Sequence, residues 1–156
     1  MADDIFLKIK GVDGESKDTK HKGEIDIHDV SFNVANPTNM AHGGGGGHGK
    51  ATMSDIHVSK NVDKASHHLA KATANGEHFP EAVFTFRKQG KEQQEYLIVT
   101  MTDVLISSWQ FAHGGNSESV SFSPAKIKYD YKEQKIDGSL GGSNVFTFDV
   151  KANKVT

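Results

Sequence analysis

The stretch Glu24-Ile25-Asp26-Ile27-His28-Asp29-Val30-Ser31-Phe32-Asn33-Val34 indicates how this chain folds. Its apolar residues occupy odd positions before His28 and even positions after Asp29. Because successive side chains of a β-strand point to opposite faces, an apolar period of two predicts a strand, and the change of phase predicts a β-bulge near these two residues. Bulges bend strands, and a closed barrel is built from bent strands. We therefore expect a mainly β protein, a small bulged antiparallel β-barrel.

The same period recurs on both sides of this stretch. It predicts further strands over residues 5–10, 52–59, 82–86, 95–109, 119–131 and 146–150. The strand over residues 95–109 is apolar on both faces, which is typical of a covered strand, and we expect it to bend near Thr102 and Asp103. A second change of phase separates Phe122 from Ile127, with Pro124 between them. Proline inside a sheet favours a bulge or an edge position.

One short helix interrupts the strands. Asp63 is a good N-cap, and Gly76 stands where a glycine commonly ends a helix. Between them, Ala65, Leu69, Ala72 and Thr73 fall on one face. We expect about three turns, lying across a barrel opening or against the sheet.

The composition limits the class of protein. The chain has 156 residues and lacks cysteine, and its 18 basic and 20 acidic residues give a formal charge of −2. Its length predicts one domain over residues 1–156, and the absence of cysteine excludes disulfides and thiolate chemistry. There is no basic excess of the kind that nucleic-acid binding uses, and no apolar run long enough for a membrane span. The N-terminus, Met1-Ala2-Asp3-Asp4, does not resemble a secretory signal peptide.

A glycine run almost matches a nucleotide-binding loop. From Gly44 the spacing to Gly49-Lys50 fits such a loop, but Ala51 replaces the serine or threonine that ligates magnesium. The residues from Thr52 onward have a strand period, whereas a phosphate loop opens a helix. We interpret the run as part of a long loop between two strands.

Other catalytic or metal-binding arrangements are weak. The nine histidines include an adjacent pair, His67 and His68, which point to different faces of a helix. His42 and His48 flank the glycine run, and no nucleophile elbow occurs. We expect no catalytic residue, no cofactor and no dedicated metal site, and hence no enzyme.

The second strand also has a polar face. Ser31 and Asn33 alternate with its apolar residues after the change of phase. Such a face is ordinary solvated sheet in a monomer, whereas in a ring it lines a wet channel. Both interpretations are compatible with the residues alone.

A series of short motifs resembles the Hcp family, the haemolysin-coregulated tube proteins of bacterial type VI secretion. The motifs follow in order along nearly the whole chain: Gly14-Glu15-Ser16 with Asp18, residues 21–27, 63–66, Gly76 with His78-Phe79, and residues 92–97, 103–108, 118–122 and 125–127. Two positions depart from the family pattern. His67 stands where the family commonly has proline at the helix start. Ser123-Pro124 replaces the Asn-Phe pair that usually precedes Ala125, so the strand pairing at this position is open.

The resemblance implies a structural subunit without a cofactor. Family members form hexameric rings that stack into a tube, are assembled in the cytoplasm and exported by the type VI machine, and carry effectors in the lumen. The implied partners are further copies of the chain, effectors, and the spike and sheath proteins. Ser31 and Asn33 become candidates for the lumen wall. The long loop becomes the candidate for ring stacking, with Asn36, Met40, His42, Gly43, Gly47, His48 and Lys50.

Two alternatives remain at this point. A monomeric β-barrel that binds a small ligand or a metal has the same strand pattern. A nucleotide-dependent enzyme requires magnesium-dependent ATP binding that Lys50→Ala abolishes, and we expect no such binding.

Overall fold

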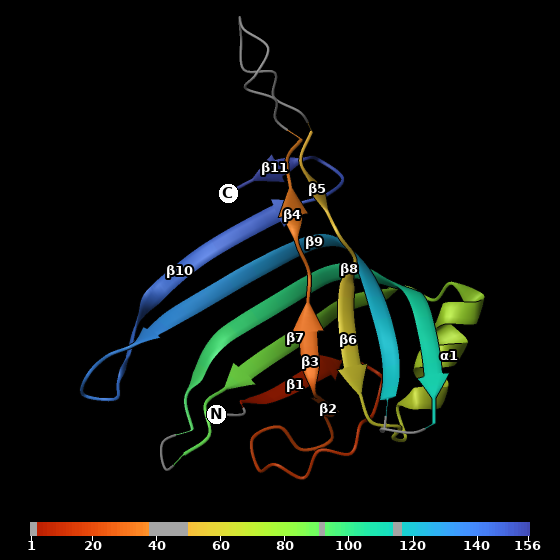
Figure 1. Cartoon of the computed structure of the whole chain (residues 1–156), viewed down its shortest axis with the longest axis horizontal. Helices are drawn as coiled ribbons and strands as arrows, with labels where there is room; N and C mark the ends of the chain where they lie inside the picture. The colour runs from red at the N-terminus through yellow and green to blue at the C-terminus, as the bar shows by residue number, and fades with distance from the viewer. Residues whose placement is uncertain (1–2, 38–49, 91–92, 114–116) are drawn as a thin grey trace, which may run out of the picture.

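The computed structural model describes residues 3–37, 50–90, 93–113 and 117–156. The protein is mainly β, with one helix, and Figure 1 shows strongly curved strands around a common interior. The strands are β1 (Asp4–Ile9), β2 (Ile25–Ile27), β3 (Asp29–Ser31), β4 (Val34–Ala35), β5 (Thr52–Met53), β6 (Ile56–Lys60), β7 (Phe79–Arg87), β8 (Glu95–Ala112), β9 (Ser117–Gln134), β10 (Leu140–Asp149) and β11 (Lys154–Val155). The helix is α1 (Ser66–Asn75).

A continuous circuit of antiparallel pairs surrounds the core. β1 pairs with β7 and β2, β7 with β8, β8 with β9, β9 with β6, and β6 with β3. Only His28 separates β2 from β3, so the segment that carries these two strands links β1 to β6. The expected bulged barrel is thus confirmed, with this segment as its bent closing piece.

The expected strand over residues 24–34 is wrong as a single element. It forms β2, β3 and β4, and the break falls at His28, where the change of phase is. The physical reason is a change of partner: β2 pairs with β1 and β3 with β6, while the His28 backbone N–H donates to the Ser59 carbonyl at 2.8 Å. The strand expected over 52–59 is likewise divided, into β5 and β6. β4 and β5 form a separate two-stranded ribbon.

β8 and β9 are the two longest strands, and they pair along almost their entire length. β8 bends at Asp103, whose φ of 51° is left-handed, as the sequence predicted for this region. β9 changes its second neighbour halfway, from β6 over residues 118–122 to β10 over residues 126–134. Pro124 lies between these two stretches, where a missing N–H costs no ladder hydrogen bond. Pairing with β8 continues through it, so the departure at this position leaves the fold intact.

β9 and β10 extend as a hairpin beyond the barrel (Figure 1). The last strand expected from the sequence, over 146–150, is the second half of the longer β10. β11 pairs with the end of β10 and had no signal in the sequence pattern.

α1 packs against β8. The helix begins at Ser66, so the expected N-cap at Asp63 is displaced from the helix proper; Asp63 instead forms the turn before it, where its Oδ1 accepts the Ala65 N–H at 2.9 Å. Gly76 ends the helix with a left-handed φ of 71°. Ala65, Leu69 and Ala72 are buried in the core, as expected. Thr73 is half-buried, and its hydroxyl donates to the Leu69 carbonyl.

The segment between β1 and β2 folds back over the outside of β1. Arg87, which is buried, donates to both carboxylate oxygens of Asp18 at 3.0 and 2.7 Å and to Asp4 at 2.9 Å. Gly14 is required here because a Cβ at this position would lie 2.3 Å from the Glu24 carbonyl oxygen. These contacts hold the segment tightly against the barrel.

Candidate assembly surface

A polar surface covers the outer face of four consecutive strands, in the order β3, β6, β9, β8. The register aligns Ser31, His57, Ser121 and Ser108 in one row and Asp29, Ser59, Ser119 and Gln110 in the next. The two rows line a shallow groove of about 310 Å³. We call this the serine face. Hydroxyl, imidazole and amide groups dominate it, and Asp29 is its one carboxylate.

Few groups within the serine face are tied to one another. His57 Nδ1 lies 2.9 Å from the Ser121 hydroxyl. Next to it, the Ser107 hydroxyl donates to Asp55 Oδ2 at 2.7 Å. Four serines of this face have exposed or half-buried side chains: Ser31, Ser108, Ser119 and Ser121. Their hydroxyls can therefore donate hydrogen bonds to, and accept them from, groups that approach from outside.

The serine face lies between two free strand edges. Within residues 3–37 and 50–90, β3 pairs only with β6. Beyond Val104, the described part of β8 pairs only with β9. A free edge presents unpaired N–H and C=O groups, which favour pairing with another strand.

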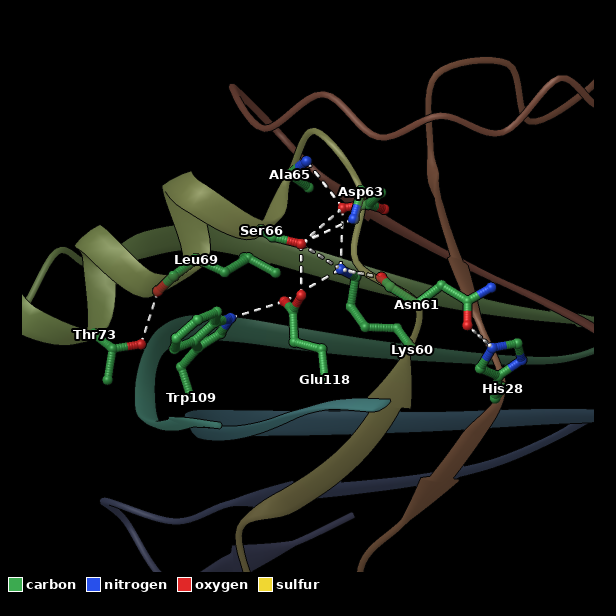
Figure 2. A network of polar contacts seen from close by, with 10 residues as sticks. All are labelled: His28, Lys60, Asn61, Asp63, Ala65, Ser66, Leu69, Thr73, Trp109 and Glu118. Atoms are coloured by element: carbon green, nitrogen blue, oxygen red, sulfur yellow. Dashed lines mark hydrogen bonds and ion pairs between the residues drawn. The ribbon is translucent and has the colours of Figure 1, made fainter. Parts of the chain in front are cut away.

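A buried polar network supports the serine face from inside the barrel (Figure 2). Lys60 on β6 and Glu118 on β9 are paired in register, and their side chains are 1% and 0% exposed. The Lys60 Nζ lies 3.2 Å from Glu118 Oε1 and 3.0 Å from Asp63 Oδ1. Ser66 donates to Glu118 Oε2 at 2.5 Å, and the Trp109 indole donates to Oε1 at 2.8 Å.

This network joins the helix to the polar strands. Ser66 is the first residue of α1, and Lys60 is the last residue of β6. Glu118 is the second residue of β9, and Trp109 lies on β8. Each of the buried charges has several partners, as burial of a charge requires. The strands that carry the serine face are therefore fixed relative to one another and to α1.

The structure divides the sequence candidates into three groups. Ser31 lies in the groove of the serine face, whereas Asn33 is exposed beyond the end of β3 and does not line it. Asn36 and Lys50 are both exposed. Met40, His42, Gly43, Gly47 and His48 lie outside the described residues, so their role in ring stacking stays a prediction.

Most residues of the serine face were not among the candidates predicted from the sequence. His57, Ser59, Ser108, Gln110, Ser119 and Ser121 all alternate with apolar residues, and that alternation was visible. What identifies them as one surface is the register between strands far apart in the chain.

Apart from the buried His21, the described histidines are dispersed over the surface. His28 lies 2.6 Å from the Asn61 side chain, His68 lies 3.2 Å from Glu77, and His78 lies 3.1 Å from Asp103. Among residues 3–37, 50–90, 93–113 and 117–156, no group of three or more histidine and carboxylate side chains is arranged to hold a metal ion. The described part of the chain also contains no helix of the length and hydrophobicity needed to span a membrane.

Comparisons with known proteins give one consistent result. Residues 6–131 match the family model described as "Type VI secretion system effector, Hcp". The chain is 40% identical to the protein Hcp1 of Pseudomonas aeruginosa, over 98% of both chains.

Solved structures agree in fold over the whole chain. A type six secretion system protein superimposes with a TM-score of 0.91 at 30% identity, covering 99% of this chain and 100% of the other. Hcp1 from Salmonella typhimurium gives a TM-score of 0.80 at 37% identity, with both chains covered completely. The chain belongs to the Hcp family of type VI secretion tube proteins.

Proposed function

We propose that this chain is a subunit of the type VI inner tube and that its serine face lines the lumen. Six copies form a ring, rings stack into a tube, and the tube is exported with effectors inside it. The observation that carries the proposal is the serine face itself: two aligned polar rows that end at a free strand edge on each side.

The free edges favour a ring over a monomer. The edges at β3 and at β8 are different surfaces, so pairing one with the other joins copies head to tail. Such heterologous contacts close into a ring when the rotation between copies allows it. In a ring of this kind the serine face of each copy continues into that of the next.

The chemistry of the serine face suits transient cargo. Short hydroxyl and amide groups exchange hydrogen bonds with water and with a protein surface at little net cost, because each bond to water is replaced by a similar one. A wall without large apolar groups holds proteins weakly and releases them. This supports a carrier role for folded effectors and requires no catalysis.

The first test of the proposal is particle mass. We expect light scattering to give about six times the 17.0 kDa subunit, and electron microscopy to show rings. A monomer that persists at high protein concentration would contradict the proposal and favour a simple binding module.

A second test separates lumen from outer surface. Ser59→Trp places a large side chain on the serine face, whereas Thr102→Trp places it at an exposed position of β8 outside the serine face. We expect both variants to keep the ring mass and only Ser59→Trp to reduce effector co-purification by about tenfold. Equal effects on cargo would show that the serine face does not line the lumen.

A further inference from the structure

The segment that folds back over β1 contains a buried histidine between two carboxylates. The His21 side chain is 9% exposed, and its ring stacks on Phe6 with a centroid distance of 4.3 Å and an interplanar angle of 10°. Nδ1 lies 2.7 Å from Glu24 Oε2, and Nε2 lies 2.6 Å from Glu95 Oε1. Glu24 is in the same segment, whereas Glu95 is the first residue of β8.

Counting protons shows what this geometry requires. A neutral imidazole has one N–H and one lone pair, and an ionised carboxylate has no proton to donate. With a neutral ring and two ionised carboxylates, one of the two contacts would bring lone pair against lone pair. One added proton, on the ring or on a carboxyl, turns both contacts into hydrogen bonds of the short, charge-assisted kind.

We propose that His21, Glu24 and Glu95 form a proton-binding site that fastens residues 12–24 to the start of β8. The bound proton is the ligand, and the segment is what it holds in place. No residue of the proposed lumen takes part, so the inference does not depend on the tube function.

In the described part of the chain, no neighbouring cationic side chain neutralises the two carboxylates directly, so the bound proton is their counter-charge. A depression of about 650 Å³ beside the site is lined by Lys8, Lys10 and Lys20 and by Glu81. Among the described residues, none of these lysines lies within ion-pair distance of Glu24 or Glu95. Arg87 contacts the same Phe6 ring at 4.9 Å from its centroid, but its own partners are Asp18 and Asp4.

Release of the proton should open the contact to Glu95 first. The Glu95 side chain is 34% exposed against 13% for Glu24, so it can turn to water at lower cost. Residues 12–24 would then keep their internal bonds, such as Gly14 N–H to the Gly23 carbonyl, and lose their tie to β8. Raising the pH should therefore loosen this segment without unfolding the barrel.

Glu95→Gln is the informative variant. A glutamine side chain can both donate and accept, so a neutral His21 can satisfy both neighbours without an added proton. His68, which faces the single carboxylate of Glu77, is the matched control, because a neutral ring satisfies one carboxylate. Glu77→Gln is the corresponding control variant.

The experiment is nitrogen NMR of the histidine rings in the full-length protein at pH 7.5, with hydrogen exchange measured in parallel. We expect two protonated nitrogens, or one beside a protonated carboxyl, at His21 of the wild type, and a neutral ring without an associated proton in Glu95→Gln. From pH 6.5 to 8.5, exchange in residues 12–24 should accelerate at least tenfold more in the wild type than in Glu95→Gln. Should Glu95→Gln fail to fold, Glu24→Gln replaces it.

Either of two results would overturn the proposal. One is a neutral His21 with both carboxylates ionised at pH 7.5. The other is a pH response of residues 12–24 that Glu95→Gln shares with the wild type and with Glu77→Gln.

Discussion

At the scale of single residues, Lys60 and Glu118 show how a buried charge is accommodated in a small barrel. Both side chains are almost completely enclosed, and both keep hydrogen bonds to neighbouring elements. Removal of one charge leaves the other buried with fewer partners, and this is far more costly than the loss of an exposed ion pair.

Lys60→Met removes the ammonium and keeps most of the stem. We expect the free energy of unfolding to fall by about 3–5 kcal/mol, because Glu118 stays buried without its counter-charge. The measurement is urea unfolding followed by circular dichroism at fixed protein concentration. Lys60→Met combined with Glu118→Gln should recover more than half of the loss, since the completely enclosed charge of Glu118 is then removed, while Asp63 keeps its hydrogen bond from the Ala65 N–H.

Lys151→Met is the control for that series. Lys151 is 76% exposed and lies 3.2 Å from Asp103, so we expect a change of at most about 1 kcal/mol. Equal losses in Lys60→Met and Lys151→Met would show that the buried network is not needed for stability.

Two aspartates should shift stability with pH in opposite directions. Hydrogen bonds from Arg87 hold the pKa of Asp18 well below its usual range, and burial raises the pKa of Asp26. Asp18 therefore contributes stability above the unfolded-state pKa of about 3.9, and that stability is lost as the pH falls through the lower folded value. Asp26 disfavours the folded state once it ionises, so its effect has the reverse sign.

Asn substitutions test these signs. At pH 7, Asp18→Asn should lower the midpoint of thermal unfolding, and Asp26→Asn should leave it unchanged or raise it. Between pH 5 and 2, roughly, the wild type should lose more stability than Asp18→Asn. A midpoint for Asp18→Asn equal to that of the wild type at neutral pH would contradict the assignment.

At the scale of elements, the bend of β8 depends on one left-handed residue. Asp103 has a φ of 51°, and its carboxylate contacts His78 at 3.1 Å and Lys151 at 3.2 Å. The hydrogen bond from His78 also holds the pKa of Asp103 below its usual value. The bend lets one strand pair with β7 in its first part and pack against α1 in its second.

Valine at position 103 should be strongly unfavourable there. We expect Asp103→Val to lose about 2–3 kcal/mol of unfolding free energy, because a β-branched residue tolerates left-handed dihedrals poorly. Asp103→Asn should lose less than about 1 kcal/mol, since asparagine adopts this conformation readily. The measurement is the free energy of urea unfolding of both variants. Similar losses would mean that the side-chain contacts of Asp103, rather than its dihedral angles, fix the bend.

The elements also show what sequence reasoning can reach. Alternation predicted the strands, the change of phase at His28 and the bend at Asp103, because these depend on neighbouring residues. It did not separate β2 from β3, since their pairing partners, β1 and β6, are set by distant contacts. The serine face was largely missed for the same reason, and the contact between His21 and Glu95 joins residues 74 positions apart.

At the scale of the whole molecule, the proposed stacking role of the glycine run is separate from the fold. The described residues on either side of it, Asn36 and Lys50, are exposed, so its shortening should not disturb the core. We expect deletion of residues 43–47 to preserve the circular dichroism spectrum and the ring mass, and to reduce tube formation seen by electron microscopy. Loss of the folded spectrum would show that the run is packed structure.

The long ladder between β8 and β9 also has a mechanical consequence. The two strands stay paired from Leu97 opposite Tyr131 to Ala112 opposite Ser117, with one change of register between Ile106 and Ser108. This ladder joins the projecting hairpin to the serine face. A force that pushes the hairpin along its own axis acts parallel to these strands, so it loads their hydrogen bonds in shear. Bonds loaded in this way must break together rather than one after another, which makes the paired strands stiff along their length.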